Sequence, residues 1–306
     1  MSTAASSLNA LETLSSAVAD AAARVSASIV QIHGRPHRPA SGIVVGAERV
    51  LTTSHSVESE EGVRVRTNAA TFLDATVVGH HEGLDLALLK VPGLKEPPLV
   101  FETGEARMGE LSLLAGRSWR GDSRVRLITI CGSGGPLQTR DGTRIERLLV
   151  LSAGPYPGFS GSAVISPRGT LVGLATAGLV RGTAVALPAP LVSRAIDELE
   201  QHGRARRGFL GVTSQPVRTS GRQKAASARD RGLAIVGIAE DSPADRAGLL
   251  VGDIMVEAAG VPLDVPEDLL ALLTPDRVDQ SLPVTVVRGA AIENLTVIVG
   301  QRPRRS

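Results

Sequence analysis

The feature that most constrains this 306-residue sequence is a series of short, β-rich apolar runs between Ser28 and Leu187, separated by turn-forming residues. The runs cover residues 29–32, 42–45, 63–65, 75–78, 86–91, 111–114, 125–130, 148–151, 163–165, 171–175 and 183–187. Many short strands at this spacing are typical of an antiparallel barrel or a pair of sandwiches. The sequence therefore predicts a mainly β domain over the first two thirds of the chain.

Helical patterns flank this β region. Asn9 followed by Glu12 resembles a capping box, and apolar residues then recur at helical spacing, which predicts an amphipathic N-terminal helix. Beyond the β region, residues 191–201 show a second amphipathic helical pattern that ends at Gly203.

The change of pattern after Gly203 indicates a second, smaller domain, as the length of the chain allows. The predicted parts are an N-terminal helix, a β domain, a basic linker and a second domain, over residues 1–25, 26–203, 204–207 and 208–302. Within the second domain, residues 213–231 are polar and rich in arginine, and we expect them to form a mobile loop.

Composition limits the possible functions. The chain is 42% hydrophobic but only 2% aromatic, so its cores must be aliphatic. A formal net charge of +2 and so few rings argue against a protein that stacks nucleic-acid bases on aromatic platforms. The arginines leave a nucleic-acid or phosphate binder as a remote alternative, and we expect no nucleic-acid partner.

The single cysteine, Cys131, lies in an apolar run and is expected to be a buried structural thiol. No Cys/His cluster has zinc-ligand spacing, so neither a metal nor a cofactor is predicted. No apolar stretch approaches the ~18 residues that a membrane span requires. Residues 1–7 carry no basic residue, unlike a signal peptide, so the sequence as written predicts a cytoplasmic location.

Three residues could together carry chemistry. His55 ends an apolar strand pattern, Asp85 begins another, and Ser160 lies between glycines in a loop. Each alone has a structural explanation, since such residues are common at strand ends and in loops. Together they supply what acyl transfer needs, because a serine hydroxyl is activated by an imidazole whose tautomer a carboxylate fixes.

At these residues the chain resembles the HtrA (DegP-like) group of trypsin-like serine proteases, and the resemblance extends over nearly its whole length. Residues 23–30 resemble the family's entry into its first barrel, and residues 183–188 its last barrel strand. Residues 242–249, followed by residues 252–254, resemble the core signature of a PDZ domain. The resemblance implies a double six-stranded β-barrel followed by an α+β PDZ domain.

The resemblance also implies roles. Ser160 would be the nucleophile, His55 the general base and then acid, and Asp85 the residue that orients His55; the amides of Gly158 and Ser160 would form the oxyanion hole. The family usually has Asn or Asp where this chain has Phe159, and a glycine where it has Ser162. Ser133 lies in a similar glycine-rich motif, but too many β runs follow it for the family's nucleophile.

The resemblance places the specificity pocket around the residue six positions before the nucleophile. That pocket would be lined by Gly154, Tyr156, Ala175, Thr176 and Ala177. The absence of an acidic residue among them argues against cleavage after Arg or Lys. We therefore expect cleavage after small or medium aliphatic residues.

In the PDZ-like domain, a glycine-containing loop before an edge strand can receive a peptide C-terminus. The expected peptide-binding residues are Gly208, Phe209, Leu210, Gly211, Val212, Leu269 and Leu273, although either leucine could instead be ordinary core. The family resemblance implies a homotrimer that degrades unfolded or damaged proteins in quality control, with extracytoplasmic location as the family norm. The alternative is a catalytically silent scaffold or chaperone that binds peptides without cleaving them.

Overall fold

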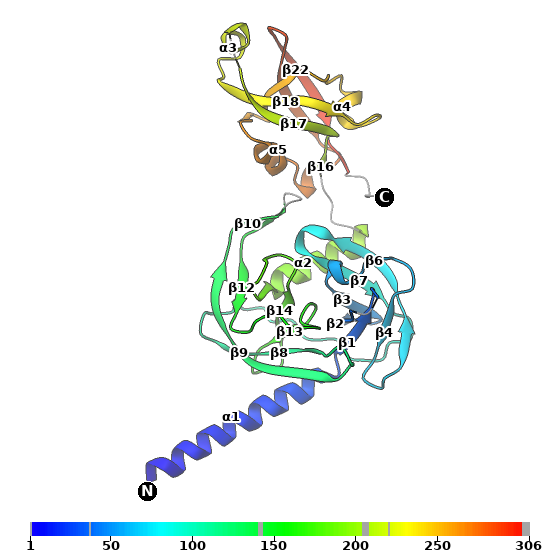
Figure 1. Ribbon diagram of the computed structural model, residues 1–306, viewed down its shortest axis with the longest axis vertical. Helices are drawn as coiled ribbons and strands as arrows, with labels where there is room; N and C mark the ends of the chain where they lie inside the picture. Colours follow the sequence, from blue (N-terminus) through cyan, green and yellow to red (C-terminus); the bar gives the residue numbers. More distant parts are fainter. Residues whose placement is uncertain (1, 37, 140–142, 204–207, 220, 302–306) are drawn as a thin grey trace. The chain divides into compact units, whose positions relative to one another are not determined.

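The computed structural model describes residues 2–36, 38–139, 143–203, 208–219 and 221–301. They form two compact units that divide after residue 205 (Figure 1). The predicted linker at residues 204–207 lies outside the described residues.

After an N-terminal helix, the first unit forms a curled antiparallel sheet of seven strands in the order β5-β4-β1-β2-β3-β7-β6. Its strands are β1 (Ile29–His33), β2 (Ala40–Gly46), β3 (Arg49–Thr52), β4 (Arg64–Arg66), β5 (Phe72–Asp74), β6 (Thr76–His81) and β7 (Leu86–Lys90). The sheet is not the closed six-stranded barrel that the resemblance implied. Its edge strands β5 and β6 are joined through Ala75 alone, so covalent continuity, rather than a hydrogen-bonded ladder, connects the two edges.

The second half of this unit is a closed six-stranded barrel in the order β12-β15-β14-β13-β8-β9. Its strands are β8 (Leu111–Arg117), β9 (Ser123–Gly134), β12 (Leu148–Leu151), β13 (Ala163–Ile165), β14 (Leu171–Thr176) and β15 (Val185–Pro188). Between β9 and β12, the strands β10 (Leu137–Gln138) and β11 (Arg144–Ile145) pair as a separate two-stranded sheet. The prediction of a mainly β, trypsin-like domain is confirmed.

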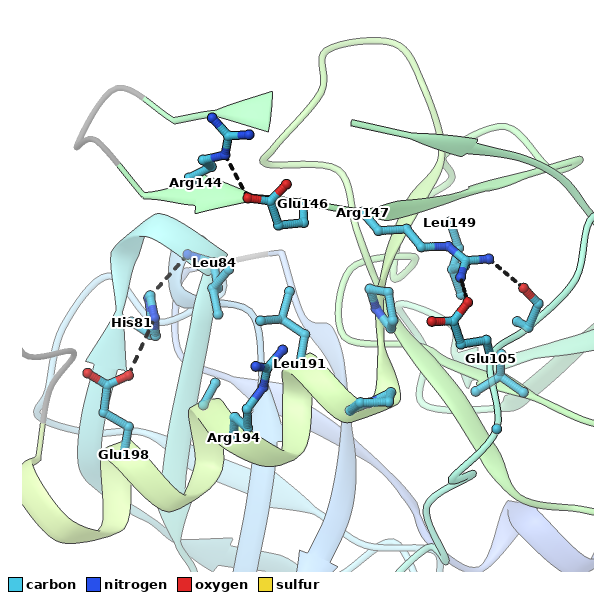
Figure 2. A pocket seen from close by; sticks show the side chains of 16 residues that line it. His81, Leu84, Glu105, Arg144, Glu146, Arg147, Leu149, Leu191, Arg194 and Glu198 are labelled. Carbon is cyan, nitrogen blue, oxygen red and sulfur yellow. Dashed lines mark hydrogen bonds and ion pairs between the residues drawn. The ribbon is translucent and has the colours of Figure 1, made fainter. Parts of the chain in front are cut away.

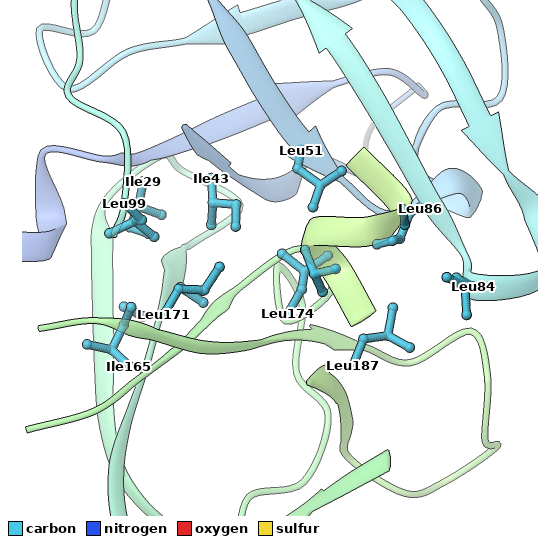
Figure 3. Close-up of a cluster of buried hydrophobic side chains, with 14 of the residues drawn as sticks. Ile29, Ile43, Leu51, Leu84, Leu86, Leu99, Ile165, Leu171, Leu174 and Leu187 are labelled. Atoms are coloured by element: carbon cyan, nitrogen blue, oxygen red, sulfur yellow. The ribbon is translucent and has the colours of Figure 1, made fainter. Parts of the chain in front are cut away.

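Aliphatic side chains fill the space between the curled sheet and the barrel (Figure 3). Ile43 and Leu51 come from the sheet, whereas Leu171, Leu174 and Leu187 come from the barrel, and all five are fully buried. Because both halves contribute to one apolar cluster, the curled sheet and the barrel are packed firmly against each other.

Cys131 is exposed, so the expectation of a buried thiol was wrong. It lies on β9, where Ile128 and Ile130 are buried and Cys131 is on the opposite face. The apolar run around it was misleading because alternate residues of a strand point to opposite faces.

Two helices border the first unit. α1 (Ser2–Ser26) begins before Asn9, so the predicted capping box does not start the helix; no proline or glycine interrupts the preceding residues. The last turns of α1 bury Ala21 and Val25 in the core. α2 (Ala189–His202) ends at Gly203 as expected.

The second unit is built on the sheet β17-β18-β19-β21-β22, with β20 paired to β19, and has a small β16-β23 sheet. Its elements are β16 (Gly208–Phe209), β17 (Val212–Arg218), α3 (Gly221–Ser227), β18 (Arg231–Ile238), α4 (Pro243–Arg246), β19 (Ile254–Ala258), β20 (Val261–Pro262), α5 (Pro266–Leu272), β21 (Ser281–Arg288), β22 (Ala291–Ile298) and β23 (Gly300–Gln301). The mobile loop expected at residues 213–231 is wrong, because β17 and α3 occupy most of it. An edge strand with one solvent-facing side needs few apolar residues, so the pattern gave little signal.

Candidate active site

His55 and Asp85 form a hydrogen-bonded pair on the curled sheet. His55 lies in the short helix η1 (Ser54–Ser56) after β3, and Asp85 follows the short helix η2 (Glu82–Leu84) before β7. His55 Nδ1 lies 2.7 Å from Asp85 Oδ2, and the His55 backbone amide donates to Asp85 Oδ1 at 3.0 Å. Since the carboxylate accepts from Nδ1–H, Nε2 is left as the proton acceptor of the ring.

Burial of the carboxylate strengthens this arrangement. The side chain of Asp85 is 8% exposed and that of His55 is 32% exposed, so the imidazole alone has appreciable access to solvent. The Thr176 hydroxyl also donates to Asp85 Oδ2. Thr176, which is predicted to line the specificity pocket, therefore bonds to the carboxylate of the pair.

Ser160 is brought to the same place by the segment 176–178. The Ala177 amide donates to Ser160 Oγ at 3.4 Å. A side-chain carbon on Gly178 would lie 2.9 Å from His55 Nδ1 and in contact with Asp85 Oδ2. Thr176 thus bonds to the predicted aspartate and Ala177 to the predicted serine, whereas Gly178 leaves no room for a side chain beside the predicted aspartate and histidine.

Ser162, two residues further, has a different environment. Its hydroxyl is fully buried and donates to the Gly158 carbonyl at 3.2 Å, and it lies 3.3 Å from Ser41 Oγ. The Ser41 hydroxyl also donates to the Gly158 carbonyl, at 2.7 Å. Ser41 and Ser162 thus fix this carbonyl inside the protein, a contact that the sequence analysis missed.

The amides around Ser160 divide into two groups. Phe159 donates to Tyr156 O at 2.8 Å, Gly161 to Ala175 O at 2.9 Å and Ser162 to Phe159 O at 3.0 Å. Within the described part of the chain, the amides of Gly158 and Ser160 have no acceptor. These are the two amides expected at the oxyanion hole, where donors must be free to bind developing negative charge.

Two glycines are required by this turn. Gly158 has φ +89° and Gly161 has φ +79°, both in the left-handed region. A side-chain carbon would contact the Arg117 carbonyl at Gly158 and the Ser41 carbonyl at Gly161. The glycines that flank Phe159 and Ser160 thus permit both the turn and its close approach to neighbouring backbone.

Of the predicted specificity-pocket residues, the structure exposes only some. Ala175 and Thr176 are fully buried, whereas Gly154 and Ala177 are exposed. The Tyr156 hydroxyl is buried near Ser162, and burial raises the pKa of this phenol although Ser162 and Arg126 both oppose the rise. Only some of the five predicted residues are therefore accessible to a substrate side chain in this structure.

Ser133 lies apart from this site. It is on β9, where it pairs with Leu149 of β12, and its hydroxyl accepts from Arg147 Nε at 3.1 Å. A regular strand position does not offer the free amides found around Ser160.

In the second unit, the predicted carboxylate-binding loop leads into an edge strand. Gly208 and Phe209 pair with Gln301 and Gly300, and Gly211 follows with φ +86°. In the described sheet β17 is an edge strand, paired on one side with β18. Such an edge can accept an extended peptide as a further strand.

The two leucines predicted to face the groove differ. Leu269 on α5 is 4% exposed and packs in the core of the second unit. Leu273, just beyond α5, is partly buried, and its carbonyl accepts from the Gly208 amide at 3.2 Å. Leu273 therefore connects the end of α5 to the predicted carboxylate-binding loop.

An ion pair fixes the turn before β19. Arg288 Nη2 lies 2.7 Å from Asp253 Oδ2, and the Leu250 amide donates to the same carboxylate at 2.9 Å. Burial alone would raise the pKa of Asp253, but the hydrogen bonds from Arg288 and Leu250 outweigh it, so the pKa lies below its ordinary value.

A cavity of about 450 Å³ lies beside α2 in the first unit (Figure 2). Four of its charged residues form two ion pairs: Arg147 with Glu105 at 2.5 Å, and Arg144 with Glu146 at 2.6 Å. Its lining includes neither His55, Asp85 nor Ser160, so its volume gives no information about the catalytic residues.

Over the described residues, we find no helix with the length and apolarity needed to cross a membrane. A family model of the trypsin-like peptidase domain matches residues 40–174, and a PDZ domain model matches residues 208–299. The fold and the site thus define a trypsin-like serine peptidase domain followed by one PDZ domain.

Relatives refine this class. The probable periplasmic serine endoprotease DegP-like of Ectopseudomonas mendocina is 27% identical over 270 residues, covering 86% of this chain and 56% of the relative. A protein of the same description from Chlamydia pneumoniae is 27% identical over 265 residues, covering 83% of this chain and 53% of the relative. Over most of its length the chain is therefore similar to the HtrA (DegP-like) serine endoproteases, and it spans about half the length of these curated relatives.

Solved structures show the same fold. HtrA-type protease AlgW with a decapeptide is 22% identical to this chain and superimposes with a TM-score of 0.69. The match covers 94% of this chain and 99% of the AlgW chain. The serine endoprotease from Yersinia pestis is 21% identical, covers 93% and 98%, and has a TM-score of 0.69.

Proposed function

We propose that this chain is an endopeptidase that cleaves unfolded or damaged proteins by acyl-enzyme chemistry at Ser160. The observation that supports it best is the pair of free amides at Gly158 and Ser160, next to a serine that residues 176–178 bring to the His55–Asp85 pair. Ser162 is a poorer candidate, because its hydroxyl is engaged inside the protein.

In this mechanism His55 Nε2 takes the proton of Ser160 as Oγ attacks the scissile carbonyl carbon. The negative charge that moves to the carbonyl oxygen is bound by the amides of Gly158 and Ser160. His55 then protonates the leaving amine, and a water molecule releases the acyl group in the reverse sense. Asp85 keeps its charge throughout and stabilises the imidazolium, and no cofactor or ATP takes part.

The proposal is tested with casein and peptide substrates. Ser160→Ala should lower turnover on the order of a millionfold, as loss of the nucleophile does in a protease of related chemistry. Ser133→Ala is the matched control and should cleave as the unmutated chain does. If the unmutated chain cleaves neither substrate, even with a peptide added for the PDZ domain, the alternative of a peptide-binding scaffold is correct.

We propose that cleavage follows small or medium aliphatic residues. No acidic side chain lies among residues 153–157, and exposed Gly154 offers no charge to bind Arg or Lys. Peptides that differ only in Ala, Val or Arg before the scissile bond test this. Faster turnover of the Arg peptide would contradict it.

We propose that the PDZ domain binds peptide C-termini along β17 and so tethers substrates. The free edge of β17 and the Gly208–Val212 loop support this, as does AlgW, which was solved with a decapeptide. A peptide added in trans separates tethering from activation: tethering leaves cleavage of a short unlinked substrate unchanged, whereas an activated protease cleaves it faster.

We also propose a homotrimer formed through the N-terminal part of the protease domain. Leu11 and Leu14 are exposed on α1, and Leu111 and Leu127 are exposed on β8 and β9. Leu14, Leu111 and Leu127 line one small apolar groove. Light scattering should give three times the chain mass of 31.7 kDa, and Leu14→Glu should shift it towards the monomer; a monomeric unmutated chain would contradict the proposal.

A further inference from the structure

The loop that carries the two free amides has an apolar centre. Phe159 lies between Gly158 and Ser160, and its side chain is 1% exposed in the core of the second barrel, with Leu114, Ile130 and Leu149. Its own amide and carbonyl are used within the turn, in bonds to Tyr156 and Ser162. The buried side chain and these two hydrogen bonds together fix the backbone of Gly158 and Ser160 on either side of Phe159.

Tyr156 continues this contact towards the surface. Its ring meets the Phe159 ring edge to face, with centroids 5.7 Å apart and planes at 80°. This is a favourable aromatic geometry. Because Tyr156 O also accepts from the Phe159 amide, the two residues are joined through both backbone and side chain.

Arg126, on the barrel strand β9, contacts this aromatic pair through Tyr156. Its guanidinium carbon lies 4.2 Å from the centroid of the Tyr156 ring, which is close enough for a cation–π contact. Among the described residues Arg126 has no carboxylate partner, and its guanidinium lies against the tyrosine ring instead. β9 is paired with both β8 and β12, so it gives this arginine a rigid support.

We propose that Arg126, Tyr156 and Phe159 are positioning residues that hold the oxyanion loop, residues 156–160, in its catalytic form. They act by side-chain packing and by a cation–π contact. The inference rests on the proposed function, because it concerns how the loop supports hydrolysis at Ser160. None of the three side chains contacts the reacting atoms; they act through the amides of Gly158 and Ser160.

The test uses variants that leave the barrel core filled. Arg126→Ala removes the exposed cation, Arg126→Lys retains one, and Tyr156→Leu keeps an apolar side chain without the ring. Arg64→Ala is the matched control, because Arg64 lies over the exposed Phe72 ring at 5.1 Å on the curled sheet. Peptide kcat and KM are measured together with hydrogen exchange of residues 156–162.

Since an oxyanion exists only in the transition state, kcat should fall while KM stays unchanged. We expect about a two- to fivefold loss for Arg126→Ala, corresponding to an exposed cation–π contact, and partial rescue by lysine. The loss for Tyr156→Leu should be about tenfold, because both ring contacts are removed. The protected amides of Phe159, Gly161 and Ser162 should exchange faster in both variants, with Arg64→Ala unchanged.

Unchanged kcat and unchanged exchange in Arg126→Ala and Tyr156→Leu would overturn the inference, as would a change confined to KM. If the unmutated chain does not hydrolyse peptides, the proposed function fails. Hydrogen exchange then still decides whether the three side chains hold the loop.

Discussion

The two halves of the active site are held by different interactions. On the curled sheet, His55 and Asp85 are fixed by hydrogen bonds, including one from Thr176. On the closed barrel, the Ser160 loop is fixed by a buried Phe159, with glycines allowing the turn. Polar bonds set the direction of a proton transfer, whereas packing sets the position of backbone amides.

Because of this difference, substitutions in the two halves should affect activity and stability to different extents. A polar substitution at the His55–Asp85 pair changes chemistry and leaves the apolar core filled. A truncation at Phe159 empties part of the barrel core and displaces the oxyanion loop at the same time. The predictions below test this contrast, beginning with the largest effect.

Asp85→Asn should lower kcat by about 10⁴, because an amide that donates to Nδ1 favours the wrong imidazole tautomer. The free energy of unfolding of Asp85→Asn should fall by much less than the activation free energy of the reaction rises. Peptide turnover and urea unfolding measure the two quantities. Asp74→Asn, at an exposed position on β5, is the control with unchanged turnover, and equal losses in the two variants would refute the role of Asp85.

Phe159→Ala should lower the free energy of unfolding of the first unit by about 3–5 kcal/mol, the usual cost of truncating a buried aromatic residue. Activity should fall as well, because the loop loses its support. Urea unfolding of the full chain measures the first effect. An unfolding curve that matches the unmutated chain would mean that the loop is held by something other than this packing.

Gly178→Ala should lower kcat by about 10², the effect of displacing catalytic groups by about an ångström. The added carbon would lie against His55 Nδ1 and Asp85 Oδ2. Gly104→Ala is matched to it, because Gly104 has no left-handed φ and no close neighbour at its side-chain position. Similar kinetics for the two variants would show that residue 178 does not support the pair.

The smallest effect concerns the second unit, where an ion pair between Arg288 and Asp253 fixes the turn before β19. The pKa of Asp253 is lower when folded than when unfolded, so its contribution is present above about pH 4 and is lost as the pH falls through the folded pKa. We expect a loss of about 2 kcal/mol, as for hydrogen bonds to a charged group. Hydrogen exchange of β19 and β21 measures it.

In Arg288→Met this part of the acid dependence should be weaker, because the carboxylate loses the partner that lowers its pKa. An unchanged acid dependence in this variant would show that another group is responsible.

Much of this arrangement was predictable from the sequence. Short apolar runs marked most strands of the first unit, and the resemblance identified the PDZ-like domain. Cys131 was misjudged because an apolar run does not say which face of a strand a residue occupies. The segment 213–231 was misjudged because an edge strand and a short exposed helix bury few side chains.

Other contacts could not be predicted because they join residues distant in the sequence. Thr176 reaches Asp85, and Ser41 and Ser162 meet at the Gly158 carbonyl, only after the sheet and the barrel have packed together. Arg126 on β9 and Tyr156, which follows β12, likewise meet only after these two strands have paired. Sequence motifs predicted the candidate reacting residues, whereas the contacts that hold them arise from tertiary packing.

The central claim is that Ser160 is the serine activated by His55. It is tested most directly by treating the chain with a fluorophosphonate and locating the adduct by mass spectrometry of its peptides. The account predicts one adduct, on Ser160, that disappears in Ser160→Ala and is strongly reduced in Asp85→Asn. An adduct on Ser162 or Ser133, or labelling that persists in Ser160→Ala, would contradict it.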